Sequence, residues 1–63
     1  MPNINEIIKS GDYSFTVRAT KKLGLECYDV VRMSQVESIV LRTAMNETTA
    51  LRMLEDELRK AQL

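Results

Sequence analysis

Hydroxyl and basic side chains are concentrated between positions 14 and 22 of the chain, at Ser14, Thr16, Arg18, Lys21 and Lys22. An arginine can donate two parallel hydrogen bonds to a guanine base, and a lysine is attracted to phosphate as a point charge. Hydroxyl groups bond to bases or to phosphates. These residue types at close spacing therefore predict a surface that contacts DNA, and Arg18 is the candidate for the specific contact.

The chain is poorly equipped for catalysis. It contains no histidine, which is the usual general base and metal ligand, and its single cysteine, Cys27, has no partner to activate it. The acidic run 55–57 would point to several faces of a helix and is typical of a solvated surface. With two glycines in the whole chain, no phosphate-cradling loop is expected. We expect no enzymatic activity, no metal and no cofactor.

The length of 63 residues predicts one small domain of marginal stability. A single cysteine cannot close an intrachain disulfide, so we expect the chain to associate with itself as a homodimer or higher oligomer. Its nine basic and nine acidic residues give a net charge of zero, which argues against strong nonspecific adhesion to nucleic acid. The sequence shows no export signal and no apolar run of about 20 residues, which predicts a cytoplasmic protein without membrane contact.

The elements expected to position these side chains are mostly helical. Residues 3–10 read as a short helix that Gly11 ends. Residues 13–20 alternate strictly between apolar and polar side chains, which favours a half-buried strand, although Phe15 and Ala19 also have helical spacing with Leu23. Residues 21–33 read as a second helix.

Two caps are expected in the second half of the chain. Ser34, followed by Glu37, resembles a capping box that opens a helix, and Asn46 is a cap for a helix with Glu47 in its first turn and basic residues near its end. An apolar stripe at heptad-like spacing predicts either a coiled-coil seam or packing within the domain. The residues expected to join two chains are Phe15, Val17, Val40, Leu51, Leu54 and Leu58.

The fold class expected from these elements is mostly α, a small helical domain with one short N-terminal strand. An all-α arrangement, with a helix-turn-helix or as a simple helical bundle, is the alternative. Within the single domain 1–63, we expect an arm or short helix at 1–11, a DNA-binding core at 13–46 and an oligomerisation helix at 47–63.

The stretches 14–18 and 34–39 resemble the ribbon-helix-helix family of small dimeric repressors. That resemblance covers roughly residues 13–46, and it implies a strand that pairs with the same strand of a second chain and enters the major groove. Ser14, Thr16 and Arg18 would then face DNA, while Ser34 would place backbone N–H groups near a phosphate. The stretch 20–25 followed by Val30 also resembles a helix-turn-helix.

Two functions are compatible with these residues. The first is a small dimeric DNA-binding regulator of transcription. The second is a helical module that binds a partner protein as an adaptor, assembly factor or inhibitor, for which the neutral charge and the four methionines argue.

Overall fold

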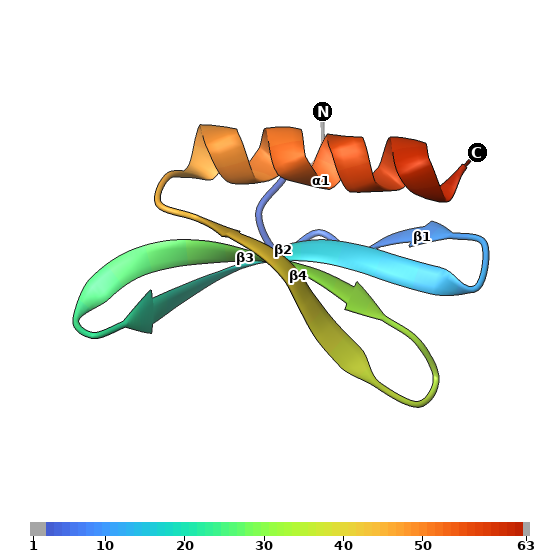
Figure 1. The fold of residues 1–63 in the computed structure, drawn as a ribbon, viewed down its shortest axis with the longest axis horizontal. Helices are drawn as coiled ribbons and strands as arrows, with labels where there is room; N and C mark the ends of the chain where they lie inside the picture. Colours follow the sequence, from blue (N-terminus) through green and yellow to red (C-terminus); the bar gives the residue numbers. More distant parts are fainter. Residues whose placement is uncertain (1–2, 63) are drawn as a thin grey trace.

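A computed structural model describes residues 3–62 as a four-stranded antiparallel sheet with one helix lying across one of its faces (Figure 1). The strands follow one another in the sheet in chain order, so each neighbouring pair is joined by a hairpin turn. The elements are β1 (Ile8–Ser10), β2 (Tyr13–Lys22), β3 (Leu25–Met33), β4 (Ser38–Ala44) and α1 (Glu47–Ala61).

The expected mostly helical fold class is wrong, because strands occupy most of the regular structure. The helix expected at 3–10 is a turn followed by β1, the helix expected at 21–33 is largely β3, and the helix expected after Ser34 is β4. The ribbon-helix-helix and helix-turn-helix arrangements both require two successive helices, whereas residues 3–62 contain only α1. The same finding contradicts the helical bundle.

The strand predicted at 13–20 is confirmed as β2. It pairs along its length with β3 of the same chain, from Ser14 opposite Met33 to Lys22 opposite Leu25, and β1 pairs with its other edge over residues 13–15. Pairing of β2 with a second chain stays a prediction. A two-residue turn brings β3 back beside β2 with little loss of chain entropy, so the intramolecular partner is the nearest one.

The turn between β2 and β3 has an unusual sequence for its backbone. Leu23 has φ of 55° and Gly24 has φ of 78°, and two successive positive values are the mark of a type I′ hairpin turn. Asparagine or glycine is favoured at the first of these positions. A leucine in the left-handed region costs about 1–2 kcal/mol, so the stabilising pairs of the hairpin must offset this strain.

The cap predicted for the last helix is confirmed. The side-chain oxygen of Asn46 accepts a hydrogen bond from the backbone N–H of Thr49 at 2.8 Å. Glu47 lies in the first turn of α1, where the helix dipole favours a negative charge, and Arg59 and Lys60 lie in the last turn.

Ser34 makes capping bonds of the predicted kind in a different element. Its hydroxyl oxygen accepts from the backbone N–H groups of Val36 at 3.4 Å and Glu37 at 3.3 Å, and it closes the turn between β3 and β4. A hydroxyl can accept such bonds both at a helix start and in a turn. The Ser34–Glu37 pattern therefore predicted the hydrogen bond correctly but assigned it to a helix instead of a turn. The expected helix start at a phosphate is therefore absent at Ser34.

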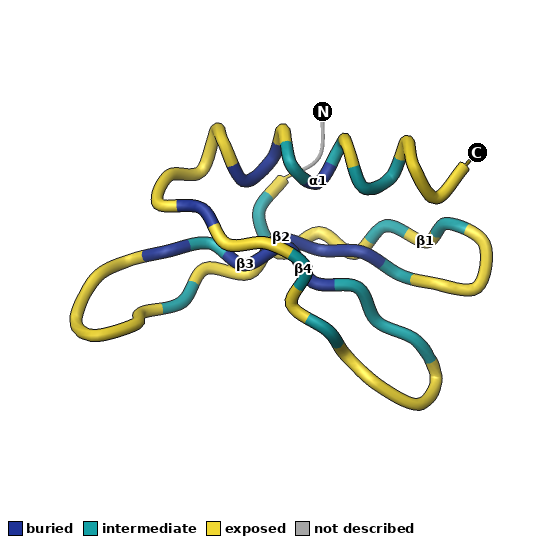
Figure 2. The backbone as a smooth tube through the Cα atoms, viewed as in Figure 1, coloured by how far each residue is buried: buried dark blue, intermediate teal, exposed yellow. Residues whose placement is uncertain are grey.

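The core lies between α1 and the sheet (Figure 2). Leu54 of α1 and the paired residues Val17 and Val30 of β2 and β3 are fully buried. The core cluster is Phe15, Val17, Val30, Ala44, Ala50, Leu51 and Leu54. One apolar stripe of a short helix and one face of a sheet together form the single core that a chain of this size supports.

Four of the residues expected to join two chains, Phe15, Val17, Leu51 and Leu54, belong to this core, so a single chain already buries them. Leu58 packs against the rim of the core, and Val40 remains 51% exposed on β4. Self-association itself stays a prediction, and Val40 is the residue of the set most available for it.

Candidate functional site

The face of the sheet opposite α1, called the open face below, is covered by no other element of residues 3–62 (Figure 1). Successive side chains of a strand point to opposite faces, and directly paired residues share a face. The residues that face away from the core are therefore fixed by the strand register. They are Lys9 of β1; Ser14, Thr16, Arg18, Thr20 and Lys22 of β2; Leu25, Cys27, Asp29, Val31 and Met33 of β3; and Ser38, Val40 and Thr43 of β4.

Arg18, Asp29 and Thr43 form one row across the middle of this face. Arg18 is directly opposite Asp29, and Asp29 is directly opposite Thr43. The carboxylate of Asp29 accepts a hydrogen bond from the Thr43 hydroxyl at 2.8 Å and one from the Lys22 ammonium at 3.1 Å. Asp29 is only 8% exposed, so this row places a buried negative charge at the centre of the open face.

The neighbours of Asp29 determine its charge state. Burial of the carboxyl acts to raise its pKa, but the hydrogen bonds from Thr43 and Lys22 and the positive charges of Lys22 and Arg18 outweigh it. The net result is a pKa below the ordinary value for an aspartate, so Asp29 is ionised at neutral pH. The ionised carboxylate therefore forms a salt bridge with Lys22 of the same chain.

Arg18, unlike Lys22, forms no salt bridge with Asp29. Its side chain is exposed, and it takes part in none of the salt bridges found within residues 3–62. Lys9, at the β1 end of the same face, is also exposed and outside those salt bridges. The open face therefore presents cationic groups that are available to a negatively charged partner.

Thr16 lies two residues before Arg18 on the same face and is 5% exposed. Its hydroxyl oxygen is buried and has no hydrogen-bond partner within residues 3–62. A buried hydroxyl without a partner costs about 1–3 kcal/mol. A polar residue in this position is therefore costly for the fold, whereas an apolar one would pack against Val31, which lies directly opposite on β3.

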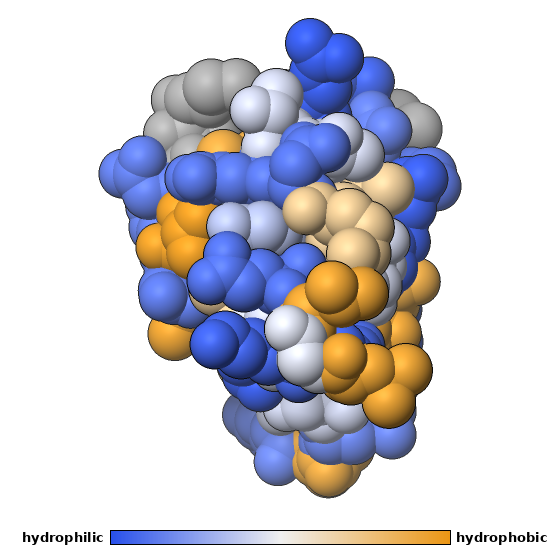
Figure 3. All heavy atoms as spheres, turned by 90° about the vertical axis from the view of Figure 1, so that its left-hand side faces the viewer, coloured by the Kyte–Doolittle hydropathy of each residue, from blue (hydrophilic) through white to orange (hydrophobic). Residues whose placement is uncertain are grey.

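The β2–β3 hairpin extends beyond both neighbouring strands. Pairing with β1 reaches Phe15, and pairing with β4 begins at Tyr28, so residues 20–27 form a two-stranded ribbon. Arg18 lies at the base of this ribbon, in the row that β4 also joins. Figure 1 shows this ribbon projecting past the start of α1. Figure 3 views the molecule from that end, where apolar side chains interrupt a largely hydrophilic surface.

The residues predicted to contact DNA are partly brought together. Ser14, Thr16, Arg18 and Lys22 share the open face, as their alternate spacing on a strand requires. Lys21 lies on the other face, opposite Glu26. Ser34 lies in the β3–β4 turn, away from the ribbon.

Lys9, Thr20, Asp29 and Thr43 also belong to the open face but were not among the predicted site residues. The place of Thr20 follows from the alternation along β2, whereas Lys9, Asp29 and Thr43 could be placed only once β1, β3 and β4 were known to be strands.

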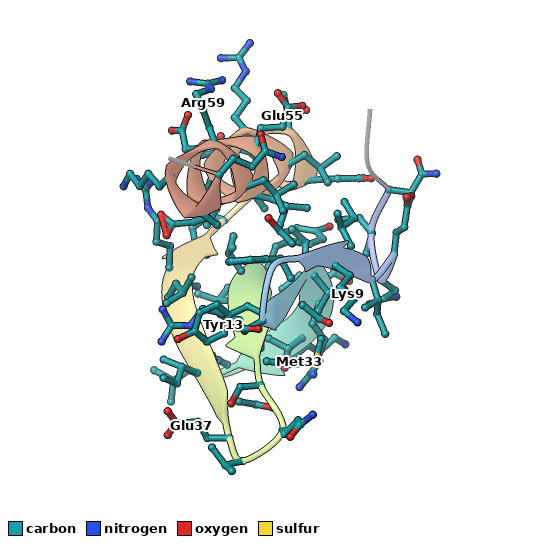
Figure 4. All side chains as sticks on the ribbon, turned by 90° about the vertical axis from the view of Figure 1, so that its right-hand side faces the viewer. Lys9, Tyr13, Met33, Glu37, Glu55 and Arg59 are labelled. Carbon is teal, nitrogen blue, oxygen red and sulfur yellow. The ribbon has the colours of Figure 1, made fainter. Side chains whose placement is uncertain are left out.

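A second feature is a shallow hollow between the β1–β2 and β3–β4 turns, with a volume of about 860 Å³. It is lined by Lys9, Tyr13, Met33 and Glu37, among others, and Figure 4 shows these side chains below α1. The guanidinium of Arg32 lies 4.4 Å from the centre of the Tyr13 ring, so a cation–π contact already occupies one face of this ring.

Within the described chain, no three carboxylate, thiol or imidazole groups come together as ligands for a metal ion. No helix of residues 3–62 has the length and apolar character that crossing a membrane requires. Comparisons with protein-family models, with curated proteins and with solved structures found no match for this chain. The function must therefore be argued from the open face itself.

Proposed function

We propose that this protein binds double-stranded DNA through the open face, with the β2–β3 ribbon in the major groove. The observation that carries the proposal is the position of Arg18, an exposed guanidinium outside the salt bridges of residues 3–62, in the middle of a strand face that also presents Ser14 and Thr20. An arginine in this setting is the side chain best suited to guanine, and nearby hydroxyls suit bases or phosphates.

The dimensions of the ribbon suit the groove. Paired strands lie about 4.8 Å apart, and the major groove, about 12 Å wide, admits a two-stranded ribbon. Side chains on one face of a strand recur about every 6.8 Å. Arg18 and Thr20 are therefore spaced to contact different base pairs along the groove, while Lys22 is held by Asp29.

The charge distribution supports specific rather than nonspecific binding. The whole chain is neutral, but the open face has three basic side chains, Lys9, Arg18 and Lys22, against the single carboxylate of Asp29. Few phosphates would be neutralised, so the affinity for random DNA should be low and weakly dependent on salt. We infer from this that the protein acts as a small transcriptional regulator with a defined target.

The test is selection from a randomised pool of duplex DNA at low salt, followed by fluorescence anisotropy on the retained sequence. Replacement of Arg18 by alanine should weaken binding by about 1–3 kcal/mol and relax the preference at one base pair. The matched control is Arg52→Ala, which removes an exposed arginine from α1 on the opposite side of the sheet. A pool from which no sequence is retained, or equal losses in the two variants, would contradict DNA binding by this face.

Lys9 gives a separate measurement on the same face. It lies at the β1 edge, one strand away from Arg18, where a phosphate contact is expected. Lys9→Ala should weaken binding to all sequences alike and reduce the salt slope by about one. A change in base preference in this variant would instead indicate that Lys9 contacts a base.

A second candidate function, binding to a protein strand, is favoured by β4. This seven-residue strand is an edge of the sheet, and its Val40 is half exposed. The free backbone groups of an edge strand are a template for another strand, and a second copy of this chain is the first partner to test. Sedimentation velocity between 1 and 100 μM (roughly the range that separates weak from stable dimers) should show a dimer that Val40→Lys disrupts. A monomer at the highest concentration would exclude self-association through β4.

A further inference from the structure

The turn at the tip of the β2–β3 ribbon contains a residue type that this kind of turn disfavours. Leu23 has a φ of 55°, in a turn position that favours asparagine or glycine, and its side chain is fully exposed at 102% of the reference area. An apolar side chain that is both strained and completely hydrated contributes nothing to the folded monomer. Such a residue at the end of a projecting ribbon indicates contact with something outside the chain.

The surroundings of Leu23 define the chemistry of that contact. Leu25, 60% exposed, follows it on the open face opposite Lys22, and Lys21 is exposed on the other side of the ribbon. The tip therefore combines two apolar side chains with basic neighbours. It is also continuous with the face that carries Arg18, because β2 runs without interruption from Arg18 to the turn.

We propose that Leu23 contacts the 5-methyl group of a thymine in the major groove, at the end of the ribbon. This inference rests on the proposed function, and it adds a second base contact to the one proposed for Arg18. The methyl group of thymine is the one apolar feature of a base pair in the major groove, and apolar side chains recognise it.

The strand geometry limits where the thymine should lie. Five residues separate Leu23 from Arg18, which corresponds to about 17 Å along a strand. This length equals about five base-pair steps of 3.4 Å along the DNA axis, and it covers fewer steps along the groove, which winds around the axis. A thymine preference is therefore expected within about five base pairs of the guanine preference that Arg18→Ala relaxes.

The experiment replaces each thymine of the selected duplex, one at a time, by deoxyuridine, which lacks only the methyl group. One replacement, within about five base pairs of the Arg18 position, should weaken binding of the natural protein about three- to fivefold, the value of one buried methyl group. In Leu23→Asn that replacement should have no further effect. Asparagine suits this turn, so the variant should fold at least as well as the natural chain.

Val36→Asn is the matched control, because Val36 is 89% exposed in the β3–β4 turn and lies off the ribbon. It should keep the full sensitivity to deoxyuridine. Binding that is insensitive to every deoxyuridine replacement, or that keeps its sensitivity in Leu23→Asn, would overturn the role of Leu23 while leaving DNA binding intact. Failure of the natural protein to bind any duplex would instead overturn the proposed function, and the thymine contact with it.

A lipid surface is the competing partner for an apolar tip with basic neighbours. Vesicles of phosphatidylcholine with phosphatidylserine should not retain the protein. If they retained the natural chain but not Leu23→Asn, Leu23 would be assigned to a membrane surface and the thymine contact would be overturned.

Discussion

The two faces of the sheet share the same strands, but only the open face buries polar side chains. On the side of α1, Phe15, Val17 and Val30 are buried in an apolar core. On the open face, the apolar residues Cys27 and Val31 are buried beside the polar residues Thr16 and Asp29. Apolar burial stabilises the fold directly, whereas buried polar groups must recover the loss of hydration through hydrogen bonds. The open face therefore adds a buried charge and a buried hydroxyl that the core side lacks.

The largest loss of stability is expected from a substitution in the core between α1 and the sheet. Leu54 is completely buried and belongs to the core cluster formed by β2, β3, β4 and α1. Leu54→Ala removes apolar contacts and leaves a cavity, so the free energy of unfolding should fall by about 2–5 kcal/mol. Urea denaturation followed by circular dichroism measures this loss. A change below about 1 kcal/mol would show that α1 is not packed on the sheet as described.

The second-largest loss of stability is expected from a substitution at the centre of the open face. Asp29→Asn keeps the shape of the side chain but removes the charge that binds Lys22 and Thr43. Hydrogen bonds to a charged group contribute about 1.5–3 kcal/mol, so a loss at the lower end of this range is expected at pH 7, because Lys22 remains half exposed. Thr43→Val is the companion variant, since it removes one donor and leaves the Lys22 salt bridge. It should cost less than Asp29→Asn.

The pH dependence of the natural chain tests the same group. The pKa of Asp29 is lower in the folded chain than in the unfolded chain, so the unfolded state binds the proton first as the pH falls. The stabilisation by Asp29 is therefore complete above the unfolded value of about 4 and is lost as the pH falls through the folded value. The difference in stability between the natural chain and Asp29→Asn should be constant from about pH 7 to pH 5 and shrink below pH 4. A constant difference down to pH 3 would contradict the lowered pKa.

Replacement of Thr16 should increase stability, in contrast to the changes at Leu54 and Asp29. Thr16→Val replaces the buried hydroxyl without a partner by a methyl group beside Val31. The melting temperature should rise, corresponding to about 1 kcal/mol. Ser14→Ala, on the same face but only partly buried, is the control and should change stability little. A loss of stability in Thr16→Val would show that the hydroxyl has a partner in solution.

The elements that could be predicted from the sequence are those with local signals. Asn46 caps α1 through a bond to a residue three positions away, and β2 shows its alternation because one of its faces is largely apolar. Both signals lie within a few residues and need no knowledge of the fold.

The rest of the sheet lacks such signals. In β3, the successive residues Val30 and Val31 are both buried, one on each face, so the alternation disappears. In β4, the register shifts between Val30 and Val31 of its partner, which interrupts the period of two. The turn at Leu23 has no asparagine to mark it. The site was therefore predictable along β2, but Asp29 and Thr43 reach it only through strand pairing.

The smallest effect on stability is expected for Arg18, and it separates folding from binding most clearly. Arg18 faces Asp29 across the β2–β3 pair, yet the carboxylate takes its hydrogen bonds from Lys22 and Thr43. The guanidinium is exposed and contributes to Asp29 only through its charge, which water and salt screen. Arg18→Ala should therefore change the free energy of unfolding by less than about 0.5 kcal/mol, while Lys22→Ala, which removes the salt bridge, should cost more. Denaturation of both variants at low and high salt measures the difference. An equal loss in the two would mean that Arg18 serves the fold, and the open face would then have no spare cation in its centre to offer a partner.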